Sequence, residues 1–168
     1  MSDKLPIIYL GRHGETAWTL SRQHTGLTDL PLTERGEHTA RRLGERLKGL
    51  TFAKVLTSPL KRAARTCELA GFGAVAEVDR DLVEWDYGQY EGRRSDEIRA
   101  ERPDWQLFRD GVPEENRPGK SVCVLTALCA RCAQFPGTSC CFRAGTSFGC
   151  WLPAGSGLNQ RPTADSSC

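Results

Sequence analysis

The first 80 residues alternate between short apolar runs and longer segments with a helical pattern. The apolar runs at residues 5–10, 52–58 and 73–78 have the length of buried strands. Residues 31–50 and 58–71, which lie between these runs, have the residue pattern of helices. The order strand, helix, strand, helix, strand predicts an α/β fold with a mostly parallel sheet covered by helices.

Both predicted helices carry start signals, and the second also carries a stop signal. Thr33 is the expected N-cap of the first helix. The apolar stripe of this helix is formed by Ala40, Leu43, Leu47 and Leu50. In the second helix, Ser58 is the expected N-cap and Pro59 the first helical residue, while Gly71 marks the end.

Length and composition limit the class of protein. The 168 residues suffice for one domain with its own core. A hydrophobic content of 39% and a net charge of +2 are typical of a soluble globular protein without a nucleic-acid surface. No apolar run is long enough to cross a bilayer, and the first residues lack the pattern of a signal peptide. We therefore expect a cytoplasmic protein with no nucleic-acid or membrane partner.

The composition changes near residue 120. Seven of the eight cysteines follow this position, whereas all three histidines precede residue 40. The charged residues after position 120 are Arg131, Arg143, Arg161 and Asp165. Residues 121–168 also show no period of 2 or 3.6. We expect residues 1–120 to form the folded domain and residues 121–168 to be an atypical Cys-, Gly- and Ser-rich tail, not a second domain.

Candidate chemistry lies at the ends of the predicted strands. Arg12 and His13 follow the first strand, and Arg62 lies on the first turn of the second helix. In parallel α/β sheets, ligands bind at the carboxyl ends of the strands. Arginine side chains suit phosphate oxygens, Gly14 lets the backbone approach a ligand, and two nearby cations disfavour protonation of an imidazole. This pattern favours a phosphate site with a neutral histidine nucleophile; the alternative is a structural histidine in a loop.

Four motifs in this order resemble those of the histidine phosphatase superfamily, also called the phosphoglycerate-mutase-like family. The resemblance covers residues 6–112. The motifs are GRHGETAW at 11–18, TGLTDLPLTERG at 25–36, TSPLKRAARTCE at 57–68 and LVEWDYGQYEGRRSDEI at 82–98. The resemblance implies a three-layer sandwich with helices on both faces of the sheet. It also implies an enzyme that acts on small phosphorylated metabolites, with no cofactor and no metal.

The resemblance implies a role for each motif residue. His13 is implied to become a phosphohistidine, Arg12 and Arg62 to hold the phosphate, and Glu84 to give a proton to the leaving oxygen. A carboxyl group that faces a bound phosphate dianion can hold a proton near neutral pH. The substrate side is implied to consist of Gly14, Thr19, Thr25, Gly26 and Tyr87. Arg93 and Arg94 are candidates for a second phosphate, although solvated charge is the simpler interpretation.

The sequence favours a phosphatase over a mutase. Mutases of this family carry an asparagine where this chain has Thr19, and they have a longer segment after the glutamate motif. The motifs resemble more closely the phosphatase branch that includes sedoheptulose bisphosphatase. The substrates are then sugar phosphates or bisphosphates. Two alternatives stay open: phosphoryl transfer of the phosphoglycerate-mutase type, and an inactive protein that only binds phosphate.

The family's second histidine, in a late turn after a strand, has no counterpart after His38. His24 is a conceivable substitute, but a solvated loop histidine is the simpler interpretation, and His38 is expected to be exposed. Back-translation of the tail in a shifted frame yields a family-like ending, so we hypothesise a reading-frame change between about Asp110 and Cys123. A zinc site at CARC, residues 129–132, and a disulfide module are weaker alternatives.

An altered tail has a structural consequence in the resembled fold. There, a late strand lies beside the strand that carries the nucleophile. Because residues 121–168 lack a regular pattern, we expect them to leave this flank of the first strand uncovered. The expected product is weakly stable, ordered best over residues 5–110, and low in activity.

Overall fold

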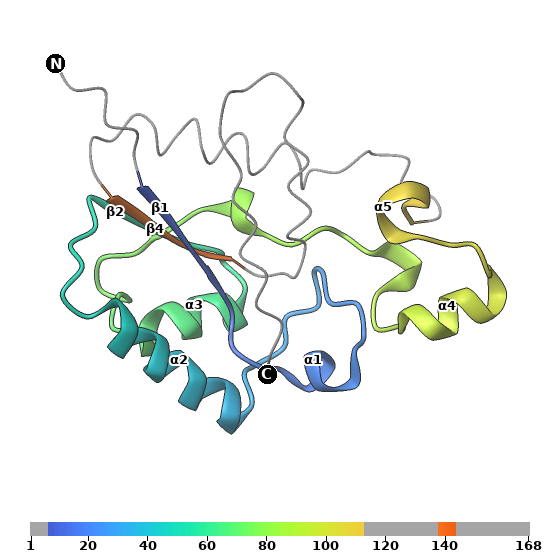
Figure 1. Ribbon diagram of the computed structural model, residues 1–168, viewed down its shortest axis with the longest axis horizontal. Helices are drawn as coiled ribbons and strands as arrows, with labels where there is room; N and C mark the ends of the chain where they lie inside the picture. Colours follow the sequence, from blue (N-terminus) through green and yellow to red (C-terminus); the bar gives the residue numbers. More distant parts are fainter. Residues whose placement is uncertain (1–6, 113–137, 144–168) are drawn as a thin grey trace, which may run out of the picture.

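The computed structural model describes residues 7–112 and 138–143. Its sheet contains the strands β1 (Ile7–Arg12), β4 (Thr138–Arg143), β2 (Lys54–Thr57) and β3 (Glu77–Val78), in this spatial order. All three neighbouring pairs are parallel. Two helices, α2 (Glu34–Leu47) and α3 (Lys61–Leu69), lie side by side on one face of the sheet (Figure 1). The predicted α/β fold with a parallel sheet is confirmed.

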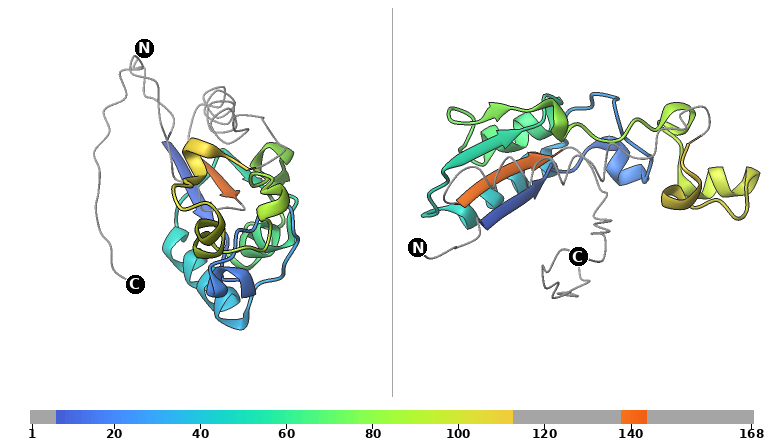
Figure 2. Two further views of the ribbon diagram at one scale, coloured as in Figure 1. Left: turned by 90° about the vertical axis from the view of Figure 1, so that its right-hand side faces the viewer. Right: turned by 90° about the horizontal axis from the view of Figure 1, so that it is seen from above.

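Strand β4 lies between β1 and β2, as Figure 2 shows. Cys140 is in register with Tyr9 on one side and with Val55 on the other. The expectation that the tail leaves the flank of the first strand uncovered is therefore wrong. An interior parallel strand needs paired backbone on both sides and apolar side chains toward the core. Residues 138–143 meet both needs, since the side chain of Phe142 is fully buried.

The rest of the tail lies outside the described residues. The hypothesised frame change, the CARC motif at residues 129–132 and the proposed disulfide module all belong there, so each stays a hypothesis. The described helices α2 and α3 cover one face of the sheet; the second helical layer stays a prediction. Within the described ranges, no helix combines the length and apolar character needed to span a bilayer.

The two helices begin in different ways. Thr33 is the N-cap of α2, and its hydroxyl accepts a hydrogen bond from the N–H of Gly36 at 3.0 Å, as predicted. The prediction of Ser58 as the N-cap of α3 is wrong, because that helix begins at Lys61. The N–H of Ser58 still continues the sheet by donating to the carbonyl of Phe142. The carboxylate of Asp29, from a distant loop, accepts from the N–H of Lys61 at 2.7 Å instead.

Two further sequence expectations need adjustment at their ends. The third strand is limited to Glu77–Val78, and residues 73–75 form a turn instead. Helix α2 ends at Leu47, so Leu50 lies beyond it and is exposed. The stop at Gly71 is confirmed, because this residue follows the C-cap of α3 with a φ of 90°.

The described core has two main parts. One lies between the sheet and the helices and consists of Leu47, Val55, Cys67, Ala70 and Phe142. The other holds together residues 85–112 and consists of Tyr87, Tyr90, Ile98, Trp105 and Val112. The short elements are α1 (Ala17–Ser21), η1 (Arg80–Leu82), η2 (Gly88–Tyr90), α4 (Ser95–Glu101) and α5 (Leu107–Asp110). Elements α1, α4 and α5 lie beyond the carboxyl ends of the strands (Figure 1), where the candidate residues gather.

Candidate active site

His13 directly follows β1 and is buried, with 7% of its surface exposed. Its Nδ1 lies 2.6 Å from the carbonyl oxygen of Gly14. Because a carbonyl oxygen can only accept, Nδ1 must carry the proton and donate it to this bond. Nε2 is then left with its lone pair. The backbone of the RHG motif thus fixes the tautomer that a nucleophilic histidine requires.

The surroundings of His13 also keep the ring neutral. The pKa of His13 is lowered to about 4, mainly by burial; the bond to the Gly14 carbonyl opposes this effect, and the positive charges of Arg62 and Arg12 add to it. A neutral imidazole is the form that can attack phosphorus. The sequence-based expectation that nearby arginines disfavour protonation agrees with this direction, although burial is the larger cause.

This lowered pKa predicts a pH-dependent stability. Below pH 6.5, the ordinary pKa of histidine, His13 is protonated in the unfolded chain. In the folded chain it stays neutral down to about pH 4. Stability from this source is therefore present above pH 6.5 and is lost as the pH falls. Between pH 7 and pH 5, we expect the free energy of unfolding to fall by about 2 kcal/mol more in the wild type than in His13→Asn. Urea unfolding at both pH values measures this; equal falls would contradict it.

Arg62 lies on the first turn of α3 and is fully buried. Its Nη1 donates to the carbonyl of Thr28 at 2.8 Å, and its Nη2 donates to the carbonyl of Gly26 at 2.7 Å. Its buried Nε has no hydrogen-bond partner among the described residues. Two backbone carbonyls thus fix the plane of the guanidinium group. The group lies close enough to His13 for its positive charge to lower the pKa of the imidazole.

Arg12 and Glu84 complete the group. Arg12 is the last residue of β1 and is exposed at the rim of the site. Glu84 lies between η1 and η2, is only 4% exposed, and accepts from the N–H of Trp85 at 3.0 Å. Desolvation lowers the pKa of the fully buried Arg62 and also that of Arg12, whose exposed side chain is still partly surrounded by protein, and the negative charge of Glu84 opposes this effect in both. The site thus brings together one neutral imidazole, two cations and one carboxyl group.

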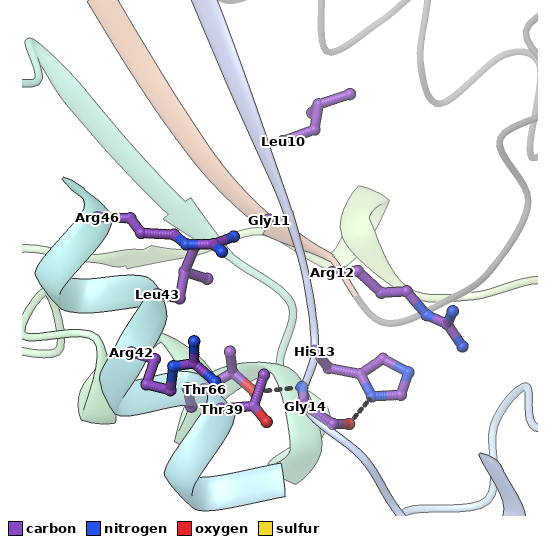
Figure 3. A pocket seen from close by; sticks show the side chains of 11 residues that line it. Leu10, Gly11, Arg12, His13, Gly14, Thr39, Arg42, Leu43, Arg46 and Thr66 are labelled. Atoms are coloured by element: carbon purple, nitrogen blue, oxygen red, sulfur yellow. Dashed lines mark hydrogen bonds between the residues drawn. The ribbon is translucent and has the colours of Figure 1, made fainter. Parts of the chain in front are cut away.

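The side chains of Arg12 and His13 point to the same side of β1 (Figure 3). A cavity of about 300 Å³ lies between β1 and α2, and its lining includes Arg12 and His13 as well as Leu43 and Arg46. The imidazole ring points away from Leu43 and Arg46, so we expect phosphate to bind on the side of β1 that the ring faces. No group of three or more His, Cys, Asp or Glu side chains suited to a metal ion occurs in the part of the chain that the structure describes.

The residues expected on the substrate side lie in different environments. Gly14 and Gly26 are both buried. The carbonyl of Gly14 bonds to His13, and the carbonyl of Gly26 bonds to Arg62. The buried ring of Tyr87 lies within electrostatic range of both arginines. The hydroxyl of Thr19 instead donates to the carbonyl of Thr16 and accepts from its N–H at the start of α1. The hydroxyl of Thr25 donates to the carbonyl of Gln23 at 3.2 Å.

The described contacts of His24 are with Ser95, Tyr87 and Trp105 and not with His13. Its Nε2 is 3.1 Å from the hydroxyl oxygen of Ser95, and its ring stacks on Tyr87 with centroids 4.9 Å apart. It lines a separate cavity of about 860 Å³ next to Trp105 and Arg99. The interpretation of His24 as a solvated loop residue is wrong because these rings half-bury it. That His24 replaces the second histidine stays a hypothesis, and His38 is exposed on α2.

Arg93 and Arg94 are held by carboxylates. Arg93 bonds to Glu101, and Arg94 lies 3.0 Å from Asp96 and 3.3 Å from Glu97. These ion pairs agree with the simpler interpretation of solvated surface charge. Binding of a second phosphate here would have to compete with them.

Sequence reasoning missed Thr66 and Gly36. The hydroxyl of Thr66 accepts from the N–H of Gly14 at 2.9 Å and donates to the carbonyl of Arg62 at 2.6 Å. It therefore connects the loop of His13 to the helix of Arg62. Its position four residues after Arg62, on the same helix face, was the signal. Gly36 gives no such signal: its backbone packs against the backbone of Glu15, a contact between distant segments.

Gly36→Ala is expected to destabilise the fold. A methyl group there would lie 2.2 Å from the carbonyl oxygen of Glu15 and would push α2 away from the His13 loop. Although alanine favours helices, we expect the free energy of unfolding to fall by about 1–3 kcal/mol. Urea unfolding measures the change, with Glu45→Ala on the exposed side of α2 as the control. Increased stability of Gly36→Ala would show that the two backbones can separate at no cost.

Comparison with known proteins agrees with this geometry. The model of the histidine phosphatase superfamily (branch 1) matches residues 8–137, past the compositional boundary at residue 120. An acid phosphatase of Mycobacterium tuberculosis is 43% identical, with 63% of this chain and 53% of the relative covered. A probable phosphoglycerate mutase of Cronobacter sakazakii is 38% identical, with 68% and 55% covered. Sedoheptulose 1,7-bisphosphatase of Saccharomyces cerevisiae is 38% identical, with 66% and 49% covered.

The chain spans about half the length of these curated relatives. Among solved structures, the product of an open reading frame of Mycobacterium tuberculosis matches with a TM-score of 0.75 and 33% identity. That match covers 84% of this chain and 75% of the other. With the family model matched over most of its length and with His13, Arg12 and Arg62 gathered at the carboxyl end of a parallel sheet, the chain belongs to the histidine phosphatase superfamily.

Proposed function

We propose that this chain carries the phosphoryl-transfer centre of a phosphomonoesterase that acts on small phosphorylated metabolites through a phosphohistidine at His13. The observation that carries the proposal is the buried, neutral imidazole, whose Nδ1 is held by the Gly14 carbonyl while two arginines act on it. The acid phosphatase and the sedoheptulose bisphosphatase among the relatives support the reaction class.

In the first step, Nε2 of His13 attacks the phosphorus and the bond to the substrate oxygen breaks. Glu84 gives its proton to that leaving oxygen. Arg12 and Arg62 stabilise the negative charge on the oxygens of the transferring group, which is the main contribution of a protein to such a reaction. The products of this step are an alcohol and phosphohistidine, with Glu84 ionised.

In the second step, a water molecule attacks the phosphohistidine. Glu84 takes one proton from the water, the bond between phosphorus and Nε2 breaks, and inorganic phosphate forms. His13 returns to the neutral tautomer because Nδ1 keeps its proton on the Gly14 carbonyl throughout. The reaction is hydrolysis of a phosphomonoester, and sugar phosphates or bisphosphates are the proposed substrates.

A mutase-type transfer is the second candidate, since one relative is a probable phosphoglycerate mutase. The two reactions differ only in whether water or a substrate hydroxyl takes the phosphoryl group from His13. The position where mutases carry an asparagine holds Thr19, whose hydroxyl bonds within α1. An inactive phosphate-binding protein is a third candidate. Its support is that the described contacts of His24 are not with His13 and that His38 is exposed.

The test uses the full chain under reducing conditions. A panel of sugar phosphates, a bisphosphate, 3-phosphoglycerate and p-nitrophenyl phosphate, each labelled with ³²P, is incubated with the protein. Phosphatase activity predicts release of inorganic phosphate together with an acid-labile labelled protein. Label that moves to a second hydroxyl without release of phosphate would establish the mutase. Binding without any protein label would establish the phosphate-binding protein.

A further inference from the structure

We infer that Glu91 is a positioning residue for Arg62, and that it acts through the backbone of residues 26–28. Glu91 belongs to no role assigned above. The catalytic consequence of this inference rests on the proposed function, because it concerns the arginine that holds the phosphate. The geometric part concerns only how this chain orients a buried guanidinium.

The guanidinium group of Arg62 is held by two backbone carbonyl groups. Its two terminal nitrogens donate to the carbonyls of Gly26 and Thr28 at 2.7 and 2.8 Å. The direction of the guanidinium plane therefore depends on where these carbonyl groups point. Since carbonyl groups are fixed by their peptide planes, any rotation of residues 26–28 also turns Arg62.

The backbone of residues 26–28 is held in turn by the carboxylate of Glu91. The Glu91 carboxylate accepts from the N–H of Gly26 at 2.8 Å (Oε1) and 3.0 Å (Oε2), and from the N–H of Thr28 at 3.0 Å (Oε1). The same two residues thus donate to an anion through their N–H groups and accept from a cation through their carbonyl groups. Hydrogen bonds to ionised groups are stronger and shorter than those between neutral groups. Residues 26–28 form a backbone bridge between Glu91 and Arg62.

The backbone bridge of residues 26–28 is closely packed against its neighbours. A Cβ atom at Gly26 would lie 2.1 Å from the carbonyl oxygen of Trp85 and 2.8 Å from Oε2 of Glu91. At the other end, Asp29 accepts from the N–H of Lys61, at the start of the helix that carries Arg62. The bridge is therefore in contact with the glutamate motif on one side and joined to α3 on the other. The negative charge of Glu91 also acts on Arg62.

The expected effects follow from the bonds that each variant keeps. Glu91→Ala removes all three acceptor contacts, and a shift of about 1 Å in a positioned group can lower kcat/KM by about 10²-fold. Glu91→Gln can keep the two contacts of Oε1, but its amide group cannot accept from Gly26. We expect Glu91→Gln to lower kcat/KM by no more than about 10-fold. Glu101→Ala, an exposed carboxylate on α4, is the matched control and is expected to have no effect on catalysis.

The decisive experiment is a double-mutant cycle with Arg62→Ala. If Glu91 acts through Arg62, Glu91→Ala lowers kcat/KM in the wild type and has almost no further effect once Arg62 is gone. The same cycle is measured on the dissociation constant of inorganic phosphate, which does not require turnover. An equal fold-loss from Glu91→Ala in both backgrounds would overturn the inference, as would wild-type kcat/KM and phosphate affinity in Glu91→Ala.

Thermal unfolding of each variant guards against loss of the fold, and Glu91→Gln keeps the test possible if Glu91→Ala does not fold. The two proposals can fail separately. A wild-type protein that binds phosphate but forms no phosphohistidine would refute the proposed function. The coupling between Glu91 and Arg62 in phosphate binding would still decide the inference.

Discussion

Replacing His13 by Ala is expected to abolish both phosphate release and the acid-labile phosphoenzyme. In the proposed mechanism the imidazole forms the covalent bond, and its Nε2 carries the only lone pair that the ring presents for attack. Loss of a nucleophile that works together with other catalytic groups typically lowers kcat by several orders of magnitude, so we expect a fall on the order of 10⁴-fold or more. Release of phosphate and ³²P labelling of the protein are the two measurements.

His38→Ala is the matched control for this variant, because His38 is a second histidine of the chain and its side chain is exposed on α2. It is expected to keep wild-type labelling and turnover. If His13→Ala still hydrolysed phosphomonoesters at the wild-type rate, the nucleophile would be another group and the proposed mechanism would be wrong.

Replacing Arg62 by Lys is expected to lower kcat/KM on the order of 10²-fold. Arginine donates to the carbonyls of Gly26 and Thr28 from two separate nitrogens, and its other N–H groups remain able to donate to a phosphate. An ammonium group keeps the charge but cannot satisfy both carbonyls in the same geometry. The size of the effect is that of losing one donor that stabilises the transition state.

Arg65→Lys, one turn further along α3, serves as the control, because Arg65 forms ion pairs with Glu37 and Glu68 at the surface. Steady-state kinetics on one phosphomonoester compares the two variants, and urea unfolding separates loss of catalysis from loss of the fold. An unchanged kcat/KM in Arg62→Lys would place this side chain outside the phosphate site.

Local sequence signals were enough to predict the elements that depend on neighbouring residues. The apolar run at 5–10 and the cap at Thr33 are such cases, since strand length and helix capping are decided within a few positions. The same holds for His13 and Arg12, which are adjacent in the chain. The place of Arg62 at the same sheet end followed from the strand–helix order of the parallel fold.

The features that sequence reasoning missed are contacts between distant segments. The cap of α3 comes from Asp29, 32 positions before Lys61, and the anchor of residues 26–28 comes from Glu91. The pairing of residues 138–143 with β1 and β2 was missed for a related reason. An interior parallel strand is specified mainly by its neighbours in the sheet, so an irregular composition did not exclude it.

The place of β4 in the sheet has a consequence for synthesis of the protein. Strands β1 and β2 are not hydrogen-bonded to each other; each pairs with β4, which follows β2 by about 80 residues. A ribosome that adds 5–20 residues per second needs on the order of 10 s to make this stretch. During that interval the nascent chain holds the strand of His13 and the strand before Arg62 without the strand that joins them. The end of the sheet that carries the candidate active site is therefore assembled late, and a chaperone that shields β1 would act in this interval.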